Sequence, residues 1–138
     1  MNEQEFKDRT KRFALRVIRF VEALPKGTTS GVLGRQLLRS ATSVGANYRA
    51  ACRAKSPADL MSKLAIVEEE ADEALYWMEL LVESELVSSA RVADLMNEAN
   101  EIAAMTVASL KTLRSGNRAS QTIQNPKSKI QNGKWGKG

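Results

Sequence analysis

Apolar residues recur along the first part of the chain at alternating intervals of four and three positions. This interval places the side chains in one stripe along an α-helix, whereas a half-buried strand needs alternation at every second residue. The stripe consists of Phe6, Thr10, Phe13, Val17, Phe20 and Leu24. Pro25 follows it directly and disfavours helical geometry at the residue before it. The pattern predicts a first helix from about Asn2 to Leu24.

A second apolar stripe follows the turn-forming segment that begins at Lys26. It consists of Leu33, Leu37, Ala41, Val44, Tyr48 and Ala51. Small residues beside the stripe would let a neighbouring helix approach closely, and they include Gly34, Gly45, Ala46 and Ala50. The pattern predicts a second helix from about Thr29 to Ala54.

The start of a third helix is marked by Ser56, Pro57 and Asp59. A serine suits the N-cap, a proline suits the first helical position, and a carboxylate in the first turn matches the exposed amides there. The apolar stripe that follows consists of Leu60, Leu64, Val67, Ala71, Ala74, Met78 and Leu81. These signals predict a helix that begins at Pro57 and continues past Leu81.

A fourth helix is predicted after Ser88 or Ser89, either of which could cap it. Its stripe consists of Val92, Leu95, Ala99, Ile102, then Thr106 or Met105, then Leu110 or Leu113. Arg114 and Gly116 resemble a last-turn cation and a C-terminal glycine, so we expect the helix to end there.

Four long helices joined by short links predict an all-α fold, an antiparallel up-down-up-down four-helix bundle. We assign residues 1–114 to the bundle. Residues 115–138 contain five Lys or Arg and no acidic residue, with little apolar surface. We therefore expect residues 115–138 to form a disordered basic tail.

The composition fits one domain rich in aliphatic residues. The chain has 138 residues, of which 43% are hydrophobic and only 5% aromatic, so packed helices suit it better than a β-sandwich. A single cysteine, Cys52, cannot form an internal disulfide, and its helical context suggests a packed thiol. The polar start of the chain lacks the apolar core of a signal peptide, and no apolar run is long enough to span a membrane. We expect a soluble cytoplasmic protein without a membrane partner.

Charge is divided unevenly along the chain. Residues 1–55 carry a net charge of +8, residues 56–110 a net charge of −10, and the last 28 residues a net charge of +7. The segment that holds the first two predicted helices is therefore basic, and the segment that holds the third and most of the fourth is acidic. Such a division indicates contact with a charged partner, either a second copy of the chain or a polyanion.

Several segments resemble the four-helix bundle proteins encoded in intervening sequences of bacterial 23S ribosomal RNA genes. They are Leu24-Pro25, Arg35 to Asn47 with the motif RSATSVGAN, Ser56 to Leu60, and Lys63 to Leu81 with the motif EADEALYW. The resemblance covers about residues 10 to 110. It implies a bundle, and it brings no settled biochemical activity.

The same superfamily includes the accessory variability determinants of diversity-generating retroelements. Those relatives are pentameric barrels that bind nucleic acid and a partner reverse transcriptase. The resemblance therefore implies a homo-oligomer, a pentamer by analogy, and it adds two candidate partners: RNA or DNA, and a reverse transcriptase or another protein.

The composition argues against catalysis. The chain has no histidine, so histidine-assisted nucleophiles and glutamate-histidine di-iron sites are excluded. Glu70 with Glu73, and Glu98 with Glu101, are carboxylate pairs at helical spacing that could face one another around a hard cation. Solvated acidic faces explain the same spacing. We expect no enzymatic activity, no metal and no cofactor.

A polar network is predicted between the second and third helices. Arg39 and Asn47 lie on one side of the second helix, and Glu70 and Glu73 share a side of the third. An arginine-carboxylate pair, with Asn47 completing the hydrogen bonds, would fix which helices face each other. In the alternative, Arg39 extends to solvent and Asn47 bonds only a backbone group.

Arginines on the first two helices are the candidate nucleic-acid-binding residues. On the first helix, the spacing of Arg9, Arg12, Arg16 and Arg19 places them in one row, with Lys11 beside it. The candidates on the second helix are Arg35, Arg49 and Arg53. Guanidinium rows of this kind can bind successive phosphates without reading bases. In the alternative, this basic half binds the acidic half of a second copy.

The sequence thus predicts a non-catalytic oligomeric scaffold that binds RNA or DNA without sequence preference through a basic face on its first two helices. A purely structural or protein-binding oligomer with no nucleic-acid role is the alternative.

Overall fold

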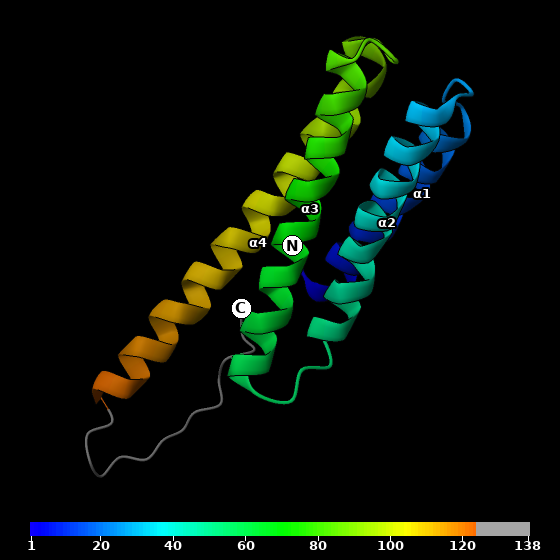
Figure 1. Cartoon of the computed structure of the whole chain (residues 1–138). Coiled ribbons are helices and arrows are strands. Elements are labelled where there is room, and N and C mark those ends of the chain that lie inside the picture. Colours follow the sequence, from blue (N-terminus) through cyan, green and yellow to red (C-terminus); the bar gives the residue numbers. More distant parts are fainter. Residues whose placement is uncertain (124–138) are drawn as a thin grey trace.

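The computed structural model describes residues 1–123 and contains four helices: α1 (Glu3–Glu22), α2 (Thr28–Ala51), α3 (Pro57–Glu83) and α4 (Ser89–Ile123). No strand occurs among the described residues. Successive helices run in opposite directions and are joined by short turns (Figure 1). The predicted all-α, antiparallel four-helix bundle is therefore confirmed.

Side-chain caps explain where two of the helices begin. At α1, the Asn2 side chain accepts a hydrogen bond from the Glu5 backbone N–H at 2.8 Å, and the Glu5 carboxylate accepts one from the Asn2 backbone N–H at 3.0 Å. At α3, the Ser56 hydroxyl accepts a hydrogen bond from the Asp59 backbone N–H, and Pro57 occupies the first turn. Both helices start at residues whose side chains bind amides that have no partner within the helix.

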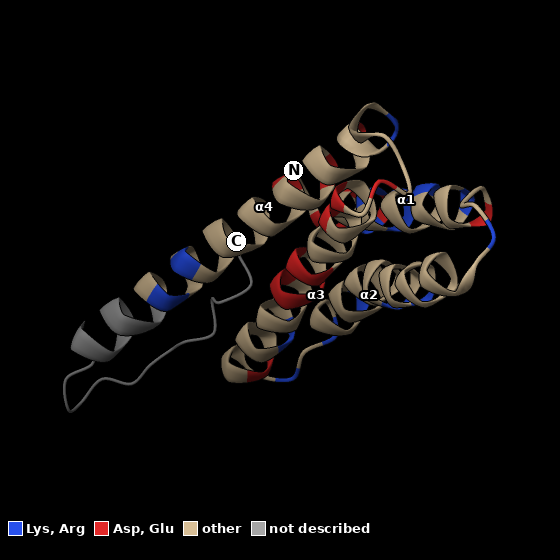
Figure 2. Ribbon diagram, turned by 45° about the horizontal axis from the view of Figure 1, so that its top comes forward, with Lys and Arg blue, Asp and Glu red and all other residues tan. Residues whose placement is uncertain are grey.

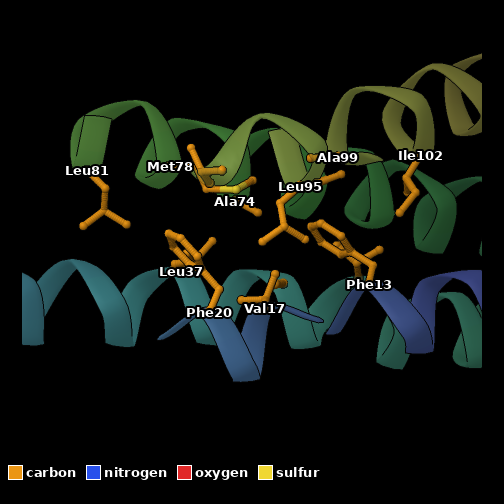
Figure 3. Packing of buried hydrophobic residues seen from close by; sticks show 14 of the residues in the cluster. Phe13, Val17, Phe20, Leu37, Ala74, Met78, Leu81, Leu95, Ala99 and Ile102 are labelled. Carbon is orange, nitrogen blue, oxygen red and sulfur yellow. The ribbon is translucent and has the colours of Figure 1, made fainter. Parts of the chain in front are cut away.

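The core follows the predicted apolar stripes (Figure 3). At two positions of the α4 stripe the sequence left a choice between two residues. Thr106 and Leu110 are the buried ones, while Met105 and Leu113 lie at the edge of the core. Buried hydroxyls are satisfied locally, since Thr10, Ser40 and Thr106 each donate to a backbone carbonyl one turn earlier. Burial of each large apolar side chain contributes on the order of 1.5–3 kcal/mol.

Two glycines of α2 allow α1 to pack closely against it. A Cβ atom added at Gly34 would lie 3.1 Å from a methyl group of Leu24, and one at Gly45 would lie 3.3 Å from the Thr10 hydroxyl oxygen. Both distances are shorter than ordinary van der Waals contact between carbon-centred groups. Gly34 and Gly45 therefore set the short separation of α1 and α2 that the small residues of the sequence predict.

The four seams of the bundle are not equally packed. The contact between α2 and α3 is the most extensive, and the contact between α1 and α4 is the smallest. The C-terminal end of α4 extends away from the other helices (Figure 1). Within residues 1–123, no helix carries an apolar stretch long enough to cross a lipid bilayer.

The predicted end of the fourth helix at Gly116 is wrong, because α4 continues to Ile123. A glycine inside a helix costs only about 0.5–1 kcal/mol relative to alanine, and no proline follows before Pro126. The first nine residues of the predicted tail, 115–123, are thus helical. The rest of the predicted tail, residues 124–138, lies outside the described residues.

Candidate nucleic-acid interface

Arg9 of α1 binds two glutamates of α4. Its Nε donates to Glu98 Oε2 at 2.6 Å, and its Nη2 donates to Glu98 Oε1 at 2.9 Å and to Glu101 Oε1 at 2.5 Å. The Arg9 and Glu98 side chains are only 18% and 16% exposed. We call these three residues the Arg9 clamp. Hydrogen bonding to Arg9 lowers the pKa of Glu98, and the charges of Arg9, Arg16 and Arg12 lower it further.

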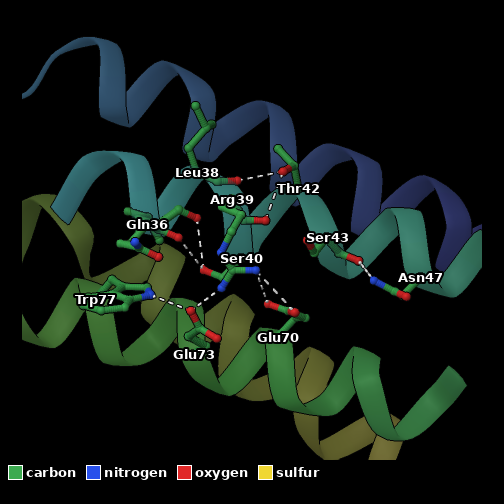
Figure 4. Close-up of polar contacts among 11 residues, drawn as sticks. Gln36, Leu38, Arg39, Ser40, Thr42, Ser43, Asn47, Glu70, Glu73 and Trp77 are labelled. Carbon is green, nitrogen blue, oxygen red and sulfur yellow. Dashed lines mark hydrogen bonds and ion pairs between the residues drawn. The ribbon is translucent and has the colours of Figure 1, made fainter. Parts of the chain in front are cut away.

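Arg39 of α2 makes the equivalent contact with α3 (Figure 4). Its guanidinium donates to Glu70 Oε1 at 3.2 Å and also to Glu73. The indole N–H of Trp77 donates to Glu73 Oε2 at 3.0 Å. Hydrogen bonds from Trp77 and Arg39 lower the pKa of the Glu73 carboxyl. We call Arg39, Glu70 and Glu73 the Arg39 clamp, and its arginine is 48% exposed.

Asn47 does not take part in the Arg39 clamp. Its side-chain amide donates to the Ser43 backbone carbonyl at 2.9 Å, one turn earlier on the same helix. The predicted role of Asn47 in the network is therefore wrong, and the alternative, a bond to a backbone group, describes it. Bonds of this kind satisfy an amide without linking two helices.

The two clamps lie on the seam that joins basic α1 to α4 and on the seam that joins basic α2 to acidic α3. Just over half of the Lys and Arg within residues 1–123 lie on α1 and α2, and half of the Asp and Glu lie on α3 (Figure 2). Each seam is crossed by one arginine bound to two glutamates three residues apart. Opposite charges at the clamps thus help to hold α1 against α4 and α2 against α3.

The predicted row of α1 arginines is divided by this arrangement. Arg9 is bound within the bundle by Glu98 and Glu101, and these contacts argue against its predicted role in binding nucleic acid. Arg12 and Arg19 are exposed, and Arg16 is half-buried. Because Arg12 and Arg16 both act on the Glu98 carboxyl, they lie on the α4 side of α1.

Other cations gather on the opposite side of α1. A hollow of about 470 Å³ between α1 and α2, the α1–α2 hollow, is lined by Lys7, Lys11 and Arg49. Small α2 residues complete its lining: Thr42, Gly45 and Ala46. Lys11 therefore faces α2 and is separated from the arginine row beside which the sequence analysis placed it.

A second hollow adjoins the first. This α2–α3 hollow, of about 760 Å³, lies where α2 ends and α3 begins. It is lined by Arg49, Arg53, Lys55 and Lys63, and its only acidic residue is Asp59. Asp59 is already bound, since it accepts hydrogen bonds from Lys63 Nζ at 2.8 Å and from the Lys55 backbone N–H at 3.1 Å.

Most of these cations lack an acidic partner. Lys7 is paired with Glu3 at 3.5 Å and Lys63 with Asp59. Within residues 1–123, no carboxylate lies within 4.0 Å of the side-chain nitrogens of Lys11, Arg49, Arg53 or Lys55. An unpaired cation retains its full attraction for an incoming anion.

Arg35 lies apart from both hollows. Its guanidinium reaches back over Gly31, and one of its nitrogens lies 3.6 Å from the position of a Cβ atom built there. Of the predicted nucleic-acid-binding residues, only Arg49 and Arg53 line the hollows. Lys7, Lys55 and Lys63 were not predicted to belong to the interface. Two features of the sequence could have indicated them: the i,i+4 spacing of Lys7 with Lys11, and the position of Lys55 at the α2–α3 turn.

Potential catalytic groups are held in unreactive settings. Cys52 is half-buried, and burial raises its pKa, so its thiol is protonated at neutral pH. Tyr48, which adjoins it, also has a raised pKa, chiefly because of burial. The two glutamate pairs lie on separate seams, each bound to an arginine. In the described part of the chain, no three Cys, Asp or Glu side chains gather in a group that could hold a metal ion.

The fold and these contacts define the class of the protein: an antiparallel four-helix bundle in which arginines of the basic helices α1 and α2 bind glutamates of α4 and α3. The chain matches the 23S rRNA-intervening sequence proteins over residues 2–108, and it belongs to that family. A similar solved structure is that of a protein with unknown function from the S23 ribosomal protein family of Bacteroides thetaiotaomicron. It is 35% identical with a TM-score of 0.75, and the match covers 80% of this chain and 99% of that chain. No curated protein matches this chain.

Proposed function

We propose that this protein is a non-catalytic, oligomeric scaffold that binds the phosphate backbone of RNA or DNA through the outer face of α2. The supporting observation is that the two adjoining hollows share Arg49 and are lined by cations from three elements. These cations are Lys7, Lys11, Arg49, Arg53, Lys55 and Lys63. Two carboxylates are paired with members of this set: Asp59 with Lys63, and Glu3 with Lys7.

The chemistry of the surface favours phosphate over base recognition. Lysine ammonium groups and exposed guanidinium groups bind phosphate oxygens whatever the base sequence. Contacts of this kind release counterions, so binding weakens steeply between about 50 and 200 mM salt. Sequence-independent, salt-sensitive binding is therefore the expected behaviour.

Self-association is the second part of the proposal, and it uses other residues. Tyr76 on the acidic helix α3 is 50% exposed and is flanked by Asp72 and Glu79. Arg12 and Arg19 form an exposed basic flank on α1. A head-to-tail contact between these two surfaces would generate a ring by repetition. By family resemblance, we expect that ring to be a pentamer.

The two parts are tested together by native mass spectrometry and by fluorescence anisotropy with a labelled nucleic acid. Arg49→Glu with Arg53→Glu is expected to abolish nucleic-acid binding while the oligomer mass stays unchanged. Arg12→Glu with Arg19→Glu, the variant matched in net charge, is expected to dissociate the oligomer into monomers.

Two results would contradict the proposal. Wild-type protein that binds neither RNA nor DNA at about 50 mM salt would end the nucleic-acid part. A wild-type protein that is monomeric in native mass spectrometry would end the scaffold part and leave the nucleic-acid part to stand on its own.

A further inference from the structure

The two basic hollows lie on opposite sides of one helix. The α1–α2 hollow takes its cations from α1 and α2, and the α2–α3 hollow takes its cations from α2, the following turn and α3. Ala46 and Arg49 belong to both. The outer surface of α2 is therefore the boundary between two cationic depressions.

The outer surface of α2 protrudes little between the two hollows, because its side chains there are small. Ala46 and Ala50 project little beyond the α2 backbone, so a second macromolecule can approach the helix closely. A helix that is flanked on both sides by cations fits a duplex, which presents a groove between two phosphate strands. The major groove of B-form DNA, about 12 Å wide, admits an α-helix, and RNA duplexes present a wide, shallow minor groove.

From this arrangement we infer that the polyanion is double-stranded, with α2 facing a groove and one phosphate strand in each hollow. Lys7 and Lys11 bind one strand, and Lys55 and Lys63 bind the other. Arg49 lies between them on α2, and Arg53 lies in the turn that follows α2. This inference rests on the proposed function and extends it from nucleic acids in general to duplexes.

The lining of the hollows also disfavours single strands. Proteins that bind single-stranded nucleic acid combine a basic groove with aromatic side chains on which bases stack. Neither hollow is lined by an aromatic residue. Tyr76, the one large aromatic side chain that is well exposed within residues 1–123, lies on acidic α3 among Asp72 and Glu79. A single strand could occupy one hollow at a time, whereas a duplex can occupy both.

The test compares duplex RNA, duplex DNA and single strands of equal length by fluorescence anisotropy across a salt series, with the full chain. Wild-type protein should bind a duplex at least tenfold more tightly than a single strand. Lys7→Gln with Lys11→Gln, and Lys55→Gln with Lys63→Gln, should each weaken duplex binding. Each pair should reduce the slope of log K against log salt by about 2, since each phosphate contact contributes ~0.9.

Lys26→Gln with Lys111→Gln is the control matched in net charge, because both residues lie outside the hollows. It should leave the salt slope unchanged, and circular dichroism should show that all three variants remain helical. Equal affinity for duplexes and single strands would overturn the inference, as would loss of duplex binding in only one of the two hollow variants. In either case, binding by the wild-type protein would leave the proposed function intact. Absence of any binding would defeat both.

Discussion

Arg9 and Arg39 make the same contact on two different seams of the bundle, yet their surroundings differ. Each arginine crosses from a basic helix to two glutamates spaced three residues apart on a neighbouring helix. The Arg9 side chain is 18% exposed and its main partner Glu98 is 16% exposed, whereas Arg39 is 48% exposed. Solvent screens an exposed ion pair and weakens its contribution, while a desolvated pair cannot lose one partner without leaving a charge uncompensated.

The comparison also concerns the packing around each clamp. The α2–α3 seam has the most extensive helix contact, so the ion pairs of Arg39 add little to its stability. The α1–α4 seam has the smallest contact. Besides the Arg9 clamp, α1 and α4 are linked by Arg91, whose guanidinium carbon lies 5.9 Å from the centre of the Phe20 ring. Polar contacts therefore carry a larger share of the cohesion where apolar packing is thinner.

The largest expected effect comes from the apolar core, which sets the scale for both seams. Phe13 is fully buried on α1, and replacement by alanine leaves a cavity. Phe13→Ala should reduce the free energy of unfolding by about 3–5 kcal/mol, measured by urea denaturation. Leu15→Ala is the control, because Leu15 is 43% exposed and its loss should cost less than about 0.5 kcal/mol. Equal effects of the two substitutions would contradict the position of the core.

Removal of the buried clamp arginine should have the next largest effect. Arg9→Met keeps much of the side-chain volume but leaves Glu98 and Glu101 without their cation. We expect a loss of about 2–3 kcal/mol in the free energy of unfolding, because a largely desolvated carboxylate loses its partner. The double variant Arg9→Met with Glu98→Leu should recover part of this loss. Failure of the double variant to recover any stability would argue that the two side chains are not coupled.

Acid should weaken the Arg9 clamp before it unfolds the core. The pKa of Glu98 in the folded protein is lowered from an ordinary value of 4.5 by Arg9, so the clamp's contribution is fully present above pH 4.5. That contribution is lost as pH falls through the lowered pKa, since the unfolded state then binds more protons. Thermal denaturation between pH 7 and pH 3 should show this decline, and Arg9→Met should show a shallower one. Parallel curves for the two proteins would contradict the assignment.

The smallest effect should come from the exposed clamp. Arg39→Ala should change the free energy of unfolding by less than about 1 kcal/mol, because half of the Arg39 side chain is in contact with solvent. Comparison with Arg9→Met in the same urea series sharpens the difference between the seams. If Arg39→Ala proved as damaging as Arg9→Met, burial would not be what separates the two clamps.

Periodicity and capping predicted most of the fold. The spacing of Phe6, Thr10 and Phe13 defined the buried face of α1, and Ser56 with Pro57 marked the start of α3, because both signals depend on residues close in sequence. The end of α4 was not predicted, since the preference of Gly116 for a helix end is weak and nothing nearby opposes continuation.

The site was less predictable, because it depends on residues that only the fold brings together. The contact of Arg39 with Glu70 and Glu73 was anticipated from the register of adjacent helices. The same Glu-x-x-Glu spacing recurs at Glu98 and Glu101, but its partner Arg9 lies on the first helix and was assigned to nucleic acid. The grouping of Lys11 with Arg49 depends on which side of α1 faces α2, a property set by packing.

The Arg9 clamp joins residues 89 and 92 positions apart in the chain. While the protein is being synthesised, the first helix can pair with the second long before the glutamates of the last helix have left the ribosome. Until then, Arg9 has neither of its carboxylate partners. The α1–α4 seam can therefore form only when the chain is nearly complete. Premature termination before Glu98 would leave α1 packed mainly against α2.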